Sequence, residues 1–242
     1  MPKAPLVYVV LGLSGSERRE VLYDVIKEGI RSEEQVLYFR PKNEVPSKTD
    51  AALLGLKNVS VIESTLQDSK LLHSEINRAA EKIFFLAPGD SDPADFIEAI
   101  KEWVDLNDCT IARVLTVVHC GFLESNPEAQ TWFDACIHFS DIILLAARAG
   151  IKNNWVKEFK DRYTKNHYPC RFLLVKKGRI QNPAEVLEIE ARRVSLYLDE
   201  LTPIEEDEFE DQMPDDRQPD KYIERLTSGQ RAYRIPDIRK LL

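Results

Sequence analysis

Short apolar runs alternate with amphipathic stretches along most of the chain. The runs are rich in Val, Ile, Leu and Phe and predict buried strands at residues 6–11, 35–39, 59–62, 82–87, 112–119, 142–146 and 171–175. The stretches between them have apolar residues at helical spacing and predict helices at residues 17–29, 71–80, 93–106, 127–138, 153–165 and 183–198. Nearly continuous apolar strands separated by helices indicate an α/β fold, with a mostly parallel, doubly wound sheet covered by helices on both faces.

Three of the predicted helices begin with the same pair of residue types. Asp92-Pro93, Asn126-Pro127 and Asn182-Pro183 each place a capping residue before a proline at the first helical position. These pairs support the predicted helix starts and say nothing of function.

The composition changes near the end of the chain. We expect one domain over residues 1–198, a flexible acidic linker over residues 199–220 and a basic C-terminal arm over residues 221–242. The linker contains Arg217 as its only basic residue. Two interpretations stay open for this end of the chain: a solvated linker with an arm docked on the domain, or a tail that binds a partner.

Charge and cysteine usage exclude several classes of protein. The net charge of −8 argues against a nucleic-acid binder. The sequence has neither an apolar run that could cross a bilayer nor a secretory signal pattern, so we expect a cytoplasmic protein with no membrane partner. The four cysteines are widely spaced, which predicts reduced thiols rather than disulfides or a zinc site.

The first predicted strand leads into a glycine-containing turn ahead of a helix. Residues 12–19 read Gly-Leu-Ser-Gly-Ser-Glu-Arg-Arg, whereas a working phosphate-binding loop has Gly, four residues, Gly, Lys and then Ser or Thr. Gly12 fits that pattern, but Glu17, Arg18 and Arg19 replace the second Gly, the Lys and the hydroxyl residue. The candidate nucleotide- or anion-binding residues of this degenerate loop are Gly12, Ser14, Gly15, Ser16, Arg18 and Arg19.

Further segments match one known family in chain order. Residues 82–94 read Lys-Ile-Phe-Phe-Leu-Ala-Pro-Gly-Asp-Ser-Asp-Pro-Ala, similar to a strand and loop ending in Gly-Leu-Ala-Asp-Pro. Residues 115–120 and 130–145 are similar to the strand and helix segments that follow, and residues 181–184, Gln-Asn-Pro-Ala, echo a late Asn-Pro. With the loop, they resemble the CobW/HypB/UreG-type metallochaperone GTPases of the SIMIBI class. The resemblance covers residues 5–198 and implies a P-loop NTPase-like sheet, with Gly89 and Asp92 in a switch-like loop.

Comparison with that family shows which of its functional residues are replaced in this chain. Arg18 replaces the phosphate-gripping Lys, and Arg19 replaces the hydroxyl that would hold Mg²⁺. Glu17 is expected to add a negative charge where a polyphosphate would lie. Leu86 and His119 replace acidic residues at two strand ends, and Ala-Ala-Arg-Ala at residues 146–149 replaces the guanine-reading Asn-Lys-x-Asp. Residues 35–86 contain no cysteine, so the family's Cys-x-Cys-Cys metal motif is absent.

Two other groups of residues could carry chemistry. His119, Cys120 and His138 could approach a metal if their elements are adjacent, although strand alternation points His119 and Cys120 to opposite faces. Core or surface roles are the alternative, and no metal ligand or catalytic residue is assigned. Arg18 and Arg19 could hold sulfate, a nucleotide monophosphate or a partner's carboxylate at a helix N-terminus.

The two arginines have a structural alternative as well. Glu20, Asp24 and Glu28 on the same helix could pair with them in a solvated network. The sequence also leaves open whether the loop is empty or is filled by Glu17 and Arg19.

The retained residues belong to turns, caps and core, and the missing ones are catalytic or ligand-reading. We therefore expect a pseudo-GTPase, a non-catalytic CobW-like protein that acts as a scaffold or regulatory partner of a homologous GTPase or of a second copy of itself. The alternative is a metallochaperone-type NTPase that still binds GTP or ATP through Arg18 in place of the Lys, without the usual Mg²⁺ contact. A third possibility is an enzyme with unrelated chemistry. The sequence offers no nucleophile–base pair to support it.

Overall fold

The computed structural model of the chain describes residues 4–73, 80–199 and 220–242. Within these ranges nine strands form one sheet in the order β4-β3-β2-β5-β1-β6-β7-β8-β9. The strands are β1 (Leu6–Gly12), β2 (Val36–Pro41), β3 (Val59–Gln67), β4 (Lys70–His73), β5 (Lys82–Leu86), β6 (Thr110–His119), β7 (Ile142–Ala146), β8 (Arg171–Lys176) and β9 (Arg179–Ile180). All neighbours are parallel except the two edge pairs β3–β4 and β8–β9. The predicted α/β class with a mostly parallel sheet is confirmed.

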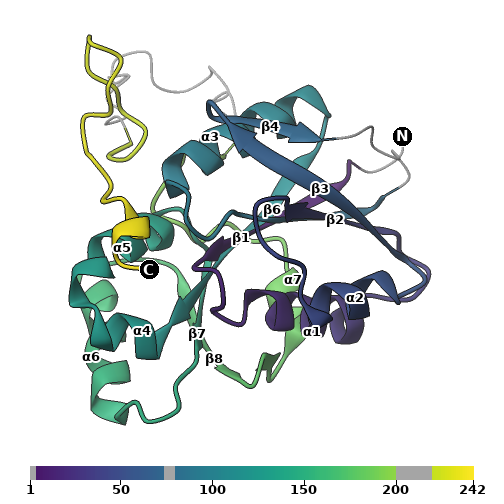
Figure 1. The fold of residues 1–242 in the computed structure, drawn as a ribbon, viewed down its shortest axis with the longest axis horizontal. Coiled ribbons are helices and arrows are strands. Elements are labelled where there is room, and N and C mark those ends of the chain that lie inside the picture. The colour runs from purple at the N-terminus through teal and green to yellow at the C-terminus, as the bar shows by residue number, and fades with distance from the viewer. Residues whose placement is uncertain (1–3, 74–79, 200–219) are drawn as a thin grey trace, which may run out of the picture.

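Helices cover both faces of this sheet (Figure 1). They are α1 (Arg18–Gly29), α2 (Lys48–Leu54), α3 (Pro93–Leu106), α4 (Cys120–Ser125), α5 (Gln130–His138), α6 (Asn153–Lys165) and α7 (Pro183–Leu187), with 3₁₀ turns η1 (Pro127–Ala129) and η2 (Ile238–Lys240). None of the helices in the described ranges has the length and apolar character that a membrane crossing needs.

Alternation along the central strand builds two separate cores. Val7, Val9 and Leu11 of β1 point to one face and pack with α3, α5 and α6, whereas Tyr8 and Val10 point to the other and pack with α1, α2 and α7. All five side chains are buried, because the central strand has helices on both sides. The near-continuous apolar run at the start of the sequence follows from this double coverage.

Two predicted helices differ from the structure. The helix expected at residues 71–80 is wrong where it can be compared, because residues 70–73 form β4, antiparallel to β3; residues 74–79 lie outside the described ranges. The helix expected at residues 183–198 ends at Leu187, and the chain continues without regular structure to residue 199. In both places the helical spacing of apolar residues predicts a helix that does not form, because tertiary contacts hold these segments in other conformations.

Buried ion pairs explain why the chain leaves the helix after Leu187. The carboxylate of Asp141, fully buried before β7, accepts hydrogen bonds from the amides of Val114 and Arg192 at 2.6 Å each. The guanidinium of Arg193 reaches both Asp141 oxygens, at 3.0 and 3.2 Å, and also pairs with Asp199. A continuous helix could not bring both the Arg192 amide and the Arg193 side chain to one carboxylate, so these bonds favour the extended path.

The proline-led helix starts are confirmed, but only one of the three capping side chains caps its helix. Asp92 accepts hydrogen bonds from the amides of Ala94 and Asp95 at the start of α3. Asn126 and Asn182 precede η1 and α7 without such a side-chain bond. The short elements α2, α4, β4, β9 and η2 have no counterpart among the elements that the sequence predicts.

The C-terminal arm, residues 221–242, returns to the domain and lies against the α3 and α5 side of the sheet (Figure 1). Tyr222 is buried there in ring contact with His138 and Phe139. The guanidinium of Arg231 donates to the carboxylates of Asp95 and Glu98 on α3, at 2.5 and 2.6 Å. The expected linker at residues 199–220 lies outside the described ranges except for its two ends.

The connections of the sheet reverse direction between the neighbouring central strands β5 and β1. After β1 the chain passes to α1 on one face, and after the neighbouring β5 it passes to α3 on the opposite face. In open α/β sheets ligands bind outside the carboxyl ends of the strands where such a reversal occurs. The loops at residues 13–17 and 87–92 lie at this place.

Candidate functional site

The turn after β1 has the tight form that the sequence predicts. Gly12 and Gly15 have φ of 125° and 77°, values that favour glycine. A Cβ on Gly12 would lie 2.4 Å from the carbonyl oxygen of Val117, so this position also needs glycine for space. The hydroxyl of buried Ser16 donates to the Leu13 carbonyl at 2.7 Å, which makes Ser16 a turn residue. Ser14, by contrast, lies exposed at the tip of the loop.

Glu17 is engaged by the β8–β9 hairpin. Its backbone is left-handed, with φ of 65°, and its carboxylate accepts a hydrogen bond from the Gly178 amide at 2.7 Å. The Glu17 carboxylate thus binds the hairpin. This corrects the expectation that its negative charge lies where a polyphosphate would bind. The carboxylates of Glu20 and Asp24 are also used elsewhere, by Thr49 and by the Ile180 amide.

The Arg18 side chain is buried between the turn after β1 and the loop that follows β5. It is 2% exposed. One guanidinium nitrogen donates to the carbonyl of Ala87, just after β5, at 2.6 Å, and the other donates to Glu44 Oε1 at 2.7 Å. The cation that stands in place of a P-loop Lys therefore has partners from two other segments of the chain.

Arg19 joins the same carboxylate. Its Nη2 donates to Glu44 Oε2 at 2.9 Å, and its Nη1 donates to the Val45 carbonyl at 2.8 Å and lies 3.3 Å from Asp50 Oδ2. Asp50 in turn accepts a hydrogen bond from Tyr38 at 3.3 Å. Both arginines are thus paired with carboxylates, Arg18 with Glu44 of the β2–α2 loop and Arg19 with Glu44 and with Asp50 of α2. Of the alternatives that the sequence left open, a carboxylate network is therefore formed, with partners other than the acidic residues of α1.

Gly89 brings the switch-like loop onto the turn after β1. Its amide donates to Glu44 Oε1 at 2.8 Å. A Cβ on Gly89 would lie 2.1 Å from the Ser14 nitrogen and 2.8 Å from an Arg18 guanidinium nitrogen. The backbone of Gly89, with Arg18 and Glu44, therefore fills the space beside the loop, and neither Glu17 nor Arg19 alone does so.

Hydrogen bonds also fix the rest of the switch-like loop. Ser91 donates to the Pro88 carbonyl at 2.8 Å, and its own carbonyl accepts from the Trp132 indole at 3.1 Å. Asp92 caps α3, and burial together with the neighbouring Asp95 raises its pKa. These bonds tie the loop to α3 and α5.

The remaining family positions carry structural side chains. Leu86 is buried at the end of β5. The His119 Nδ1 accepts a hydrogen bond from the Phe122 amide at 2.9 Å and so caps α4. Arg148, in the Ala-Ala-Arg-Ala segment after β7, is half-buried and faces the Val175 carbonyl at 3.4 Å. None of the three presents a carboxylate for Mg²⁺ or a guanine base.

The metal site considered for His119, Cys120 and His138 is not formed. His119 lies at the carboxyl end of β6, whereas His138 ends α5 before β7 begins at Ile142. Ile142 pairs with Leu115, roughly 13 Å back along β6 from His119. His138 instead pairs with Asp220 at 2.9 Å. No group of three potential metal ligands occurs within residues 4–73, 80–199 and 220–242.

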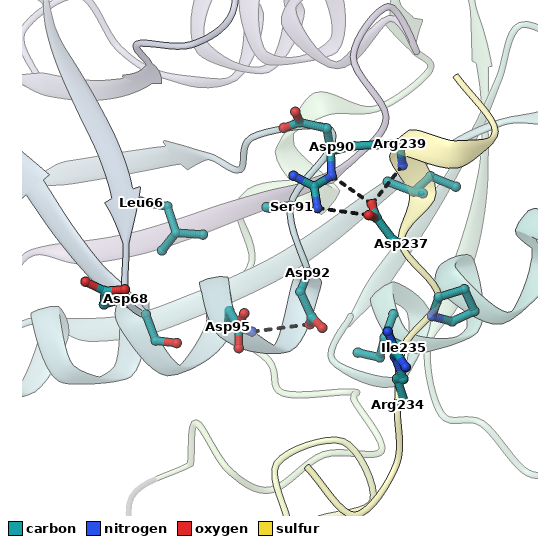
Figure 2. A pocket seen from close by; sticks show the side chains of 13 residues that line it. Leu66, Asp68, Asp90, Ser91, Asp92, Asp95, Arg234, Ile235, Asp237 and Arg239 are labelled. Carbon is teal, nitrogen blue, oxygen red and sulfur yellow. Dashed lines mark hydrogen bonds and ion pairs between the residues drawn. The ribbon is translucent and has the colours of Figure 1, made fainter. Parts of the chain in front are cut away.

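A pocket of about 500 Å³ lies between the switch-like loop, the β3–β4 turn and the C-terminal arm. Figure 2 shows Asp237 and Arg239 of the arm bonded to each other close to Asp90 and Ser91. The pocket walls include carboxylates from these elements and the guanidinium groups of Arg234 and Arg239. The arm and the switch-like loop therefore line the same pocket.

Sequence reasoning missed Glu44, the residue that organises this site. It lies 26 residues beyond Arg18, in a loop with no recognised motif. One indication was available: two adjacent arginines at a helix start need acceptors, and Lys-Asn-Glu-Val-Pro at residues 42–46 follows the next predicted strand. In a parallel sheet that loop emerges at the same edge.

Comparisons with known proteins give only distant likenesses. No known family profile matches the chain, and no curated protein matches its sequence at a significant level. Solved structures that resemble it include the Zn(II)-bound YjiA GTPase from E. coli, at 14% identity and a TM-score of 0.47, covering 78% of this chain and 67% of that chain. Another is the cell division protein FtsY from Thermotoga maritima, at 15% identity and a TM-score of 0.44, covering 78% and 69%. Likenesses this low carry no conclusion about activity.

Proposed function

We propose that the protein is a non-catalytic, CobW-like P-loop domain that acts as a scaffold or regulatory binding partner. It keeps the turn after β1 and the switch-like loop as structural parts. We propose a protein partner, either a homologous GTPase or a second copy of this chain, in the cytoplasm.

One observation carries this proposal: the Arg18 guanidinium is buried and already bonded to Ala87 and Glu44. A nucleotide phosphate would have to replace Glu44, because a P-loop cation must be free to hold it. The phosphate would have to compete with a carboxylate that the chain itself supplies and that is already buried against the guanidinium. Stable closure of the site thus favours a structural role over turnover.

The locked switch-like loop supports the same conclusion. In GTPases such a segment changes between ordered and released states with the γ-phosphate and its Mg²⁺. Here the Gly89 amide donates to Glu44 and the Ser91 carbonyl accepts from Trp132. The loop is thus fixed by the protein itself.

Nucleotide titration separates this proposal from its alternative, an NTPase that grips GTP or ATP through Arg18. Wild-type protein is titrated with fluorescent GTP and ATP analogues, with and without Mg²⁺, beside Arg18→Ala and the control Arg162→Ala, which changes an exposed arginine of α6. We expect no saturable binding up to millimolar nucleotide in any of the three.

Saturable wild-type binding that Arg18→Ala loses and Arg162→Ala keeps would establish the alternative instead. The scaffold role has its own check, which is affinity capture with the full chain. Recovery of neither a GTPase nor a second copy of this chain would count against that role.

A further inference from the structure

We propose that Arg18, Arg19 and the Gly89 amide form a binding site for an inorganic oxyanion of the phosphate class, and that Glu44 occupies this site as an internal ligand. The inference deepens the proposed function and rests on its premise that the wild-type loop holds no nucleotide. It adds that the anion site still exists and is self-filled.

Three donors from three segments converge on the Glu44 carboxylate. Arg18 Nη2 and the Gly89 amide donate to Oε1 at 2.7 and 2.8 Å, and Arg19 Nη2 donates to Oε2 at 2.9 Å. Two guanidinium groups and a backbone amide at a helix start are the donors that proteins use for phosphate and sulfate. The Glu44 side chain is only 8% exposed, so it lies inside this cradle rather than across its mouth.

The cradle has more donors than a carboxylate uses. The Nε atoms of Arg18 and Arg19 are buried and have no hydrogen-bond partner among the described residues. A carboxylate offers two oxygens to this cluster, whereas a phosphate offers four. The two arginines therefore keep hydrogen-bond donors that Glu44 does not use.

Glu44 reaches the site from the surface loop between β2 and α2. The neighbouring Val45 side chain is 84% exposed. The loop backbone is held near Glu44 by the Arg40 side chain, which donates to the Glu44 carbonyl at 3.2 Å. Removing the Glu44 carboxylate thus leaves the arginines in place, with Ala87 and Asp50 still bonded to them.

The alternative interpretation is a structural salt-bridge network that has no affinity for phosphate. Asp50 and Glu44 together balance the two positive charges, as many structural clusters do. The two interpretations differ in one measurable respect, because only a true anion site gains affinity for phosphate when the internal carboxylate is removed.

The experiment compares wild-type protein with Glu44→Ala and Glu44→Gln. Glu44→Ala makes room for an ion, and Glu44→Gln removes the charge at nearly constant volume. The control is Glu63→Ala, which takes a carboxylate from another arginine pair, that of Arg40. Binding of inorganic phosphate and pyrophosphate is measured by calorimetry at constant ionic strength set with chloride, and folding by circular dichroism.

We expect both Glu44 variants to bind phosphate at least tenfold more tightly than wild type and Glu63→Ala. Phosphate should also raise the Tm of the Glu44 variants alone, because a ligand that binds only the folded state stabilises it. Adding Arg19→Gln to Glu44→Gln should abolish the gain.

Folded Glu44 variants that bind phosphate no better than wild type would overturn the inference. Wild type binding as tightly as the variants would also overturn it, since Glu44 would then not occupy the site. If Glu44→Ala fails to fold, the Glu44→Gln result decides. Failure of the proposed function is a separate result, because it appears as nucleotide binding by the wild type.

Discussion

At the scale of single residues, the site depends on a close backbone approach and a buried carboxylate. Gly89 touches the turn after β1 closely enough that no side chain fits. Glu44 bonds the same glycine and both arginines, so one acidic residue joins β2, α1 and the switch-like loop. Each of these residues makes contacts that no neighbour in the chain could replace.

Replacing Gly89 by alanine should destabilise the protein strongly. The new Cβ would lie 2.1 Å from the Ser14 nitrogen, and backbone on both sides must shift to relieve the overlap. We expect a loss of about 1–3 kcal/mol or more in the free energy of unfolding, measured by urea denaturation.

Gly121→Ala is the matched control for that substitution. Gly121 lies in α4, and the nearest atoms to its added Cβ are 3.5 Å away, an ordinary contact. Alanine is favoured over glycine in a helix, so this variant should be neutral or more stable by about 0.5–1 kcal/mol. Equal effects at the two positions would show that Gly89 does not approach the turn as described.

At the scale of elements, the C-terminal arm is anchored where the described chain resumes. Asp220 pairs with His138 at the end of α5, and Tyr222 packs behind this pair. Farther along, Arg231 bonds Asp95 and Glu98 on α3, and Ile235 and Ile238 are buried in the core. A basic arm on an acidic helix explains the charge change that the sequence shows near its end.

Docking of the arm should weaken in acid. Burial works to raise the pKa of Asp220, and hydrogen bonds from His138 and Ser195 outweigh it, so the pKa lies below its usual 3.8. A lowered folded-state pKa means that the ionised carboxylate stabilises the docked arm above pH 3.8. This contribution is lost as the pH falls below that value.

Asp220→Asn tests this contribution by hydrogen exchange of residues 220–242 at pH 6, 4 and 3. At pH 6 the variant should have a free energy of local opening about 1–2 kcal/mol lower than that of wild type. Between pH 6 and pH 3 this free energy should fall less in the variant than in wild type. Asp237→Asn is the control, because Asp237 bonds only Arg239 within the arm. An unchanged pH dependence in Asp220→Asn would contradict the assignment.

At the scale of the whole molecule, burial protects the cysteines. All four are free thiols, and three are buried. Burial raises the pKa of Cys109 to about 11 and of Cys120 and Cys170 to about 12. It also raises the pKa of Cys136 well above its usual value. The cysteines are therefore parts of the core and its margin rather than reactive groups.

The folded protein should react slowly with a thiol reagent at pH 8, because the thiolate is the reactive form. Half-buried Cys109 should react first, and Cys120 and Cys136 should react only when the molecule unfolds. The rate of thiol modification is measured with and without denaturant. Cys109→Ser should remove the first phase of the reaction. Rapid modification of Cys136 in native protein would contradict the described core.

The sequence by itself determined the features that depend on local pattern. Buried parallel strands are apolar almost throughout, so β1, β5, β6 and β7 could be placed, and glycine spacing located the turn after β1. The helical interpretation of residues 71–73 failed because a short edge strand has no periodicity long enough to distinguish it.

Only the tertiary structure decided what Arg18 and Arg19 do. The sequence offers Glu20, Asp24 and Glu28 on the same helix as partners, yet Glu44, 26 residues away from Arg18, makes the bonds. Parallel strands bring their carboxyl-end loops to one edge whatever their separation in sequence, and ion pairs form between the charges that meet there. Hydrophobic period is a local property of the chain, whereas the choice of a charged partner depends on distances that exist only after folding.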